Sequence, residues 1–160
     1  MGAGAQDDAL LARYSEELLA ALDECVGDWV VRCVAGVADG AGVTLDRRAR
    51  GAALAAAERA RVEVVRDAGR LLRTDIDEQR SSPLEVLRSA VRHPTAVLRS
   101  AGVPPVARDA FAAAQFPDDD YDLAPASFAE VDERLHEPGL RWGAAKAHVH
   151  LRRRREEGRR

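Results

Sequence analysis

Aromatic side chains are scarce in this chain: Phe, Trp and Tyr together make up 4% of its 160 residues. A core with so few rings must be built from Leu, Val and Ala, which favours closely spaced helices over a β-sandwich. The sequence lacks a run of about eighteen apolar residues, so we expect no membrane span. Its first residues contain neither a positively charged nor an apolar segment, so we expect no signal peptide and a cytoplasmic protein.

Cysteine and lysine are also rare. The two cysteines, Cys25 and Cys33, would lie about 12 Å apart on a helix, which is too far for a disulfide. We therefore interpret them as small core residues in a reducing compartment. Lys146 is the only lysine among 24 basic residues. This Ala-, Arg- and Gly-rich composition indicates a high-GC bacterial genome.

A long amphipathic run over residues 7–38 organises the expected fold. Its apolar positions recur every three or four residues, which predicts one helix buried along a stripe. Gly27 lies within this run, and the apolar periodicity continues through it. A glycine there lowers helix stability by up to about 1 kcal/mol relative to Ala, so we expect close packing against another helix to explain it. The expected buried stripe is Leu11, Tyr14, Leu18, Leu22, Cys25, Trp29, Cys33 and Val37.

The next segment is expected to fold back on this helix. The run Asp39-Gly40-Ala41-Gly42 predicts a helix end and a tight turn, followed by a second helix over residues 45–73. Antiparallel pairing would place the alanines of residues 53–57 opposite Gly27, giving a long αα-hairpin over residues 7–73. The expected inward-facing set of the second helix is Ala49, Ala52, Ala53, Ala56, Ala60, Val64, Ala68 and Leu71.

Short helices that begin at proline are expected in residues 83–115. The eight residues from Pro83 match the eight from Pro94, and each copy predicts a helix of two to three turns. A third short helix is expected over residues 106–114. The polar stretch 74–80 before them is either a frayed helix end or a linker.

The C-terminal part is expected to hold two more helices within residues 127–151. A capping-box pattern at Ser127 predicts the first, and Glu137-Pro138-Gly139 is expected to end it. The basic residues 152–160 are expected to form a frayed tail. The whole chain is thus predicted to be a single all-α domain, 1–160, with the hairpin, the short helices and a C-terminal helix packed as a bundle.

One segment, Thr95 to Arg108, resembles the core of a bacterial helix-turn-helix, in which a short helix ends in Ala-Gly-Val and a second helix follows. The resemblance covers about a tenth of the chain and implies a turn at Gly102 with the second helix in the major groove. It departs from the family in its two prolines after the turn and in its shorter spacing. Few base-reading side chains follow beyond Arg108. We favour the alternative of a plain helix end at Gly102 followed by a new start.

Charged clusters supply the candidate contact surfaces. The net charge of −3 divides into +4 in the last ten residues and −7 in the rest. The arginines of the tail could contact phosphate, hold the chain's own acidic loop, or keep a helix end solvated. No aromatic residue interleaves them, so nucleic-acid binding is not favoured. The candidate partner contacts are Arg88, Arg99, Asp118, Asp119, Asp120, Arg152, Arg153, Arg154 and Arg155.

Catalytic and metal-binding patterns are weak. Glu133 and His136 have the spacing found in di-iron bundles, but those bundles need this pair twice and two further Glu. There is no glycine-rich phosphate loop after a strand. We therefore predict no metal, no other cofactor and no catalytic residues, and the sequence favours a non-enzyme without deciding the question.

The expected function is that of a non-enzymatic cytoplasmic protein acting through protein–protein contacts, as an adapter or regulatory partner. One alternative is a DNA-associated regulator that uses residues 95–108 and the arginine tail. A second alternative is a helical-bundle metalloprotein. A homodimer is expected if hydrophobic surface on the long helices extends beyond the cover given by residues 83–151.

Overall fold

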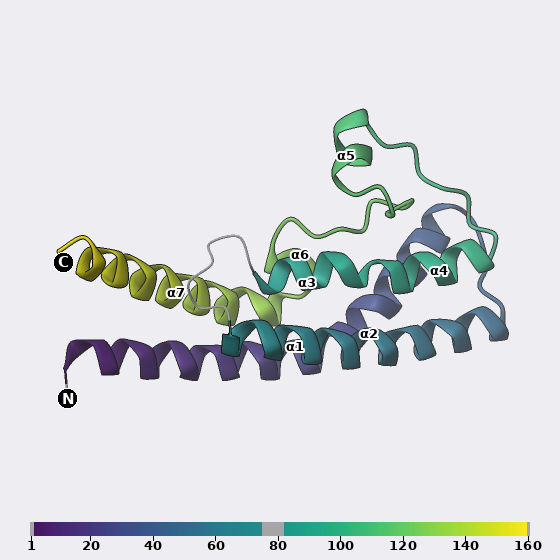
Figure 1. Ribbon diagram of the computed structural model, residues 1–160. Coiled ribbons are helices and arrows are strands. Elements are labelled where there is room, and N and C mark those ends of the chain that lie inside the picture. Colours follow the sequence, from purple (N-terminus) through teal and green to yellow (C-terminus); the bar gives the residue numbers. More distant parts are fainter. Residues whose placement is uncertain (1, 75–81, 160) are drawn as a thin grey trace.

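The computed structural model describes residues 2–74 and 82–159, and no residue in these ranges forms a strand (Figure 1). The expected all-α fold, with a long antiparallel hairpin and a packed C-terminal helix, is confirmed. Residues 75–80 of the expected linker lie outside the described residues. The elements are α1 Ala3–Gly40, α2 Arg47–Thr74, α3 Pro83–Ala90, α4 Arg92–Ser100, α5 Ala110–Gln115, α6 Phe128–Val131, the 3-10 helix η1 Glu133–Leu135 and α7 His136–Glu157.

Helix α1 is a single element of 38 residues, about 57 Å long, and it begins four residues before the expected start. It packs against α2, α4, α6, η1 and α7. Because neighbours lie on several sides, its buried arc is wider than the predicted stripe, and Tyr14, Cys33 and Val37 at the edge of that stripe are half-buried. Its buried residues are Leu11, Leu18, Leu22, Cys25, Val26, Trp29, Val30, Val34 and Ala38.

The turn between α1 and α2 is closed by a Schellman motif. The Val43 N–H donates to the Ala38 carbonyl at 2.8 Å, the Gly42 N–H donates to the Asp39 carbonyl at 2.9 Å, and Gly42 has φ +69°. This left-handed backbone is the conformation that favours glycine after a helix. Asp46 then caps α2, since its Oδ1 accepts from the Ala49 N–H at 2.7 Å.

The predicted small-residue contact of the hairpin is present. A Cβ placed on Gly27 would lie 4.0 Å from Cβ of Ala57, which is ordinary van der Waals contact. Gly27 therefore marks a close approach but leaves room for a methyl group. The inward face of α2 differs from its prediction at Ala52, which is exposed, and at Ala49 and Leu71, which are half-buried. The buried residues of α2 are Ala53, Ala56, Ala57, Ala60, Val64, Ala68, Gly69 and Leu72.

Helices α3 and α4 are separated by Val91 alone and both pack on α2. The second helix was predicted to begin at Pro94, but it begins two residues earlier. Pro94 is tolerated there because the N–H groups of a first helical turn have no intrahelical partner. The third short helix was predicted from Val106, whereas residues 103–109 are not helical and α5 begins at Ala110. Its cap is Asp109, whose Oδ1 accepts from the Ala112 N–H at 2.8 Å.

The C-terminal region contains a longer helix than the sequence predicted. The expected break at Glu137-Pro138-Gly139 is wrong, because α7 starts at His136 and Pro138 falls within its first turn. Gly139 lies against the Phe128 ring of α6, so closely that a Cβ there would be 2.3 Å from Phe128 Cδ2. Helix α7 runs antiparallel to α1 along the N-terminal half of α1 (Figure 1).

Asp132 joins α1 to this C-terminal region. Its Oδ2 accepts from Arg134 Nη2 at 2.9 Å and from Arg32 Nη2 at 3.2 Å, and its Oδ1 accepts from Arg134 Nε at 3.1 Å. The Asp132 side chain is only 7% exposed. Hydrogen bonds from Arg134 hold the pKa of the Asp132 carboxyl well below its ordinary value. This buried carboxylate therefore fixes the junction before α7.

Candidate interaction surface

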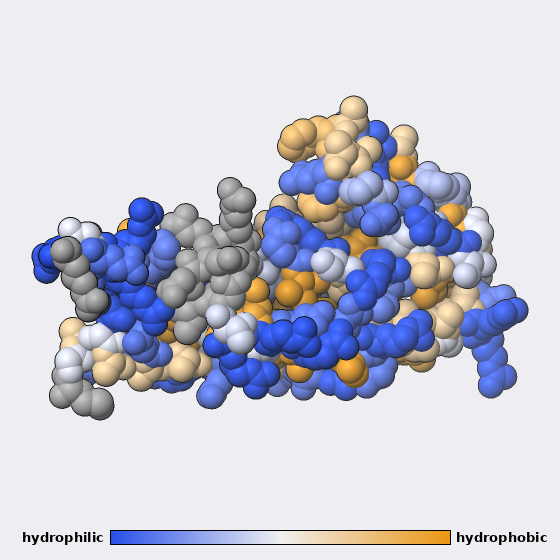
Figure 2. All heavy atoms as spheres, in the orientation of Figure 1, coloured by the Kyte–Doolittle hydropathy of each residue, from blue (hydrophilic) through white to orange (hydrophobic). Residues whose placement is uncertain are grey.

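The α5 lobe, residues 104–118, stands away from the helical body (Figure 1). Helix α5 contributes no buried residue; Phe111 is 78% exposed and Val106 is 48% exposed. Figure 2 shows hydrophobic side chains gathering on this lobe. The smaller apolar residues exposed there are Pro104, Pro105, Ala107, Ala110, Ala113 and Ala114.

Hydrogen bonds within the lobe, and between the lobe and its neighbouring residues, stabilise it. The buried Tyr121 hydroxyl donates to the Val103 carbonyl at 2.7 Å, and the Val106 N–H donates to the Asp120 carbonyl at 2.9 Å. Arg108 Nη1 donates to the Phe116 carbonyl at 2.8 Å. Burial raises the pKa of the Tyr121 hydroxyl, so this group keeps its proton and its donor role at neutral pH. The backbone that carries the exposed apolar side chains is thus ordered by these hydrogen bonds.

Asp119 shapes the loop that follows the lobe. It was predicted as a partner contact, but it is 4% exposed. Its Oδ2 accepts from the N–H groups of Leu123 at 2.6 Å and Ala124 at 2.8 Å, and its Oδ1 accepts from the N–H of Tyr121 at 3.2 Å. A buried carboxylate that accepts backbone N–H groups organises a turn. That position is therefore not available to a partner.

Arg99 and Asp120, two further candidate contacts, pair with each other. Arg99 Nε donates to Asp120 Oδ2 at 2.5 Å, and this bond holds the pKa of the Asp120 carboxyl below its ordinary value. The pair ties α4 to the loop after α5. Asp118, by contrast, is exposed at the edge of the lobe.

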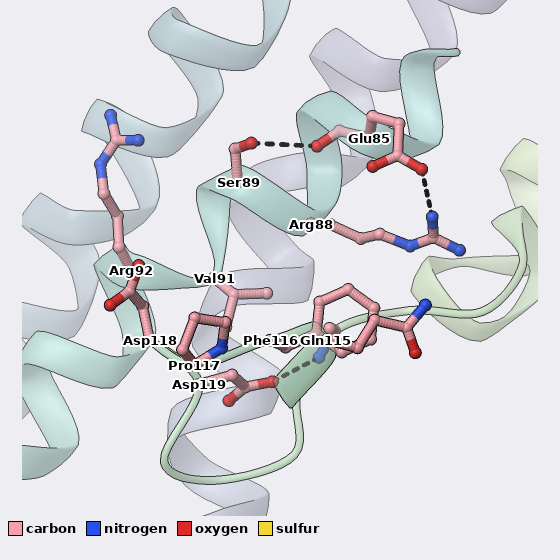
Figure 3. Close-up of a pocket in the computed structure, with 11 residues that line it drawn as sticks. Glu85, Arg88, Ser89, Val91, Arg92, Gln115, Phe116, Pro117, Asp118 and Asp119 are labelled. Carbon is pink, nitrogen blue, oxygen red and sulfur yellow. Dashed lines mark hydrogen bonds and ion pairs between the residues drawn. The ribbon is translucent and has the colours of Figure 1, made fainter. Parts of the chain in front are cut away.

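A pocket of about 360 Å³ lies between α3 and the loop after α5 (Figure 3). Arg88 crosses it: its Nε donates to the Pro125 carbonyl at 3.0 Å and its guanidinium lies 5.7 Å from the centroid of the Phe116 ring. The same guanidinium pairs with Glu85. Arg88, another candidate contact, thus connects α3 to the loop through its side chain.

The arginines expected in a frayed tail continue α7 as far as Glu157. Arg152 Nη1 lies 3.2 Å from Asp7 Oδ2, and Arg152 Nη2 lies 3.0 Å from Asp8 Oδ1. The expectation of fraying is therefore wrong for residues 152–157, because these ion pairs hold the end of α7 against the start of α1. Arg153 also approaches Asp8, at 3.6 Å, whereas Arg154 and Arg155 are exposed. Asp7 and Asp8 at this helix start are thus acidic partners of Arg152 and Arg153.

The segment that resembles a helix-turn-helix ends α4 with a Schellman motif. The Val103 N–H donates to the Leu98 carbonyl at 3.0 Å, and Gly102 has φ +75°. The same tripeptide, Ala-Gly-Val, closes α1 in the same way at residues 41–43. The resemblance thus rests on a general helix ending. The seven residues 103–109 separate α4 from α5.

The residues considered for metal binding and nucleophilic chemistry include Glu133, His136 and the two cysteines. Within residues 2–74 and 82–159, no group of three or more His, Cys, Asp or Glu side chains forms a possible metal site. Cys25 is buried, and burial raises the pKa of the Cys33 thiol to about 11. A thiol with so high a pKa carries little thiolate at neutral pH and is a poor nucleophile.

Sequence reasoning missed Phe111 and Val106 as surface residues. A usable signal was present: Ala110-Phe-Ala-Ala-Ala-Gln115 has no polar face, and prolines stand before and after it. A helix this short that is apolar on all sides can bury only one side against the protein, so its other apolar side chains stay exposed.

Comparison with family models, curated proteins and solved structures finds no match to this chain. In the part of the chain that the structure describes, no helix combines the length and the apolarity needed to cross a membrane.

Proposed function

We propose that this chain is a non-enzymatic cytoplasmic adapter or regulatory protein that binds another protein through the α5 lobe. The observation that carries the proposal is the 78% exposure of Phe111 on a helix that adds nothing to the core. Burying a phenylalanine side chain contributes about 1.5–3 kcal/mol. Exposed apolar patches with an aromatic residue are typical of protein–protein interfaces.

Two further features support this role. The lobe is already ordered by the bonds of Tyr121 and Arg108, so binding would cost little conformational entropy. The two cysteines are free thiols, as is usual in a reducing compartment.

Affinity capture from cell extract with three forms of the chain tests the proposal. F111D removes the apolar anchor, and L140D is the matched control, because Leu140 is 58% exposed on α7, outside the lobe. We expect at least one protein to be retained by the wild type and by L140D and lost with F111D. Circular dichroism should show unchanged helicity for both variants, since both sites are exposed. Equal retention by all three forms would contradict the proposal.

A further inference from the structure

The α5 lobe is acidic at its edges as well as apolar. Residues 104–122 contain five Asp and one Arg. Of these acids, Asp109, Asp118 and Asp122 are exposed. The single arginine, Arg108, is half-buried and donates to backbone carbonyls within the lobe. A partner should therefore present apolar surface bordered by basic side chains.

A surface of that kind lies on this chain itself. The Arg47 face is formed by Arg47, Arg50 and Leu54, which share one side of the first turns of α2 through their three- and four-residue spacing. All three residues are exposed, Leu54 by 64%, and Arg48 is exposed on the side of α2 toward the end of α4. Asp46 is the only acid in residues 44–55, and one of its oxygens is used by the helix cap. The charges of the two surfaces are thus opposite, with Asp109 and Asp118 exposed on the lobe, Asp122 exposed just after it, and three exposed Arg on α2.

A pocket lies beside Arg48 at the same end of α2. It has a volume of about 420 Å³ and opens between the start of α2 and the end of α4, lined by Leu45, Ala49, Val97 and Arg48 among others. Pockets of this size can enclose a small ligand or a single large side chain. The exposed Phe111 ring is the large aromatic side chain that the lobe offers to such a pocket.

The elements that carry the two surfaces lie apart on one molecule. In Figure 1 the α3–α4 pair lies between α5 and the start of α2. We infer that the α5 lobe of one copy docks on the Arg47 face of a second copy, an inference that rests on the proposed role of the lobe in protein binding. The contact joins two different patches, so it is heterologous, and it closes as a dimer only if both copies engage reciprocally.

Light scattering and sedimentation of the full chain, with two variants and their mixture, test the inference. F111D removes the anchor from the lobe, and R47E/R48E/R50E reverses the charge of the Arg47 face and of Arg48 beside it. We expect the wild type to self-associate reversibly, with a weaker association at high salt because exposed charges are screened. Each variant alone should associate at least about tenfold more weakly, and L140D should behave as the wild type.

The mixture of the two variants is the decisive measurement. The triple arginine variant keeps an intact lobe and F111D keeps an intact Arg47 face, so one contact remains and a one-to-one complex should form. A wild type that stays monomeric at its highest soluble concentration, or a mixture that forms no complex, overturns the inference. Loss of a captured protein with F111D, seen together with a monomeric wild type, would overturn self-docking and leave the proposed function standing.

Discussion

Two Gly→Ala substitutions that are alike in local chemistry should have opposite effects on stability. Gly27 and Gly139 both lie inside helices, where alanine is favoured over glycine by about 0.5–1 kcal/mol. At Gly27 the added Cβ would meet Cβ of Ala57 at 4.0 Å, an ordinary contact. At Gly139 it would lie 2.3 Å from Phe128 Cδ2 and 2.8 Å from Phe128 Cγ.

These distances set the expected magnitudes. G27A should raise the free energy of unfolding by about 0.5–1 kcal/mol, because only the helix term changes. G139A must displace the Phe128 ring or the α7 backbone, and overpacking of this kind costs about 1–3 kcal/mol. The net loss after the helix gain should lie between about 0 and 2.5 kcal/mol, and because the added Cβ would overlap the Phe128 ring we expect the upper half of this range, a fall in Tm of several degrees for a chain of this size.

Urea unfolding followed by circular dichroism measures both free energies. G36A provides the control, since Gly36 also lies in α1 and a Cβ there would meet nothing within 4 Å. It should resemble G27A. If G139A proved as stable as the wild type, α7 would not approach the Phe128 ring as described. A destabilised G27A would in turn show that the hairpin is tighter at that point.

Two further predictions concern the ion pairs that hold α7. D132N should lower the free energy of unfolding at neutral pH by about 2 kcal/mol, because it removes the negative charge between Arg32 and Arg134 and replaces one of two accepting oxygens with an NH2 group that cannot accept. The pKa of Asp132 is lowered in the folded state, so the stability that its carboxylate contributes is complete above the unfolded value of about 3.9 and is lost as the pH falls from there towards the folded value. The free energy of unfolding should therefore fall less steeply with acid for D132N than for the wild type. Parallel curves would refute the assignment. R152Q should cost about 1 kcal/mol and speed amide hydrogen exchange near Asp7 and Asp8, whereas R155Q, at an exposed position, should leave exchange unchanged.

The hairpin could be predicted from the sequence because its signals are local. The phase of the apolar positions in α1 survives Gly27, and Gly42 provides the left-handed residue that ends it. The errors in the C-terminal region have a different origin. Pro138 is harmless only because η1 sets the start of α7 just before it. The order of the arginine tail depends on Asp7, 145 residues away from Arg152, and no local pattern identifies such a pair.

The candidate surface was the hardest part to predict. The charged residues Arg88 and Asp119 are predicted as partner contacts, yet in the folded chain they make hydrogen bonds to the backbone of the chain itself. Phe111 was overlooked because apolar residues are expected inside. The apolar segment between prolines indicates that some of its side chains stay exposed, whereas which of them are exposed depends on where the segment after α4 leaves the bundle.

The long α1 helix takes part in two kinds of contact that differ in loop-closure entropy. Its pairing with α2 closes across residues 41–46, a short connection that brings the helices together early in folding. Its pairing with α7 includes contacts between residues 141 to 145 positions apart. We therefore expect α7 to dock late in folding, and the start of α1 that it covers to exchange its amide hydrogens faster than the part of α1 paired with α2.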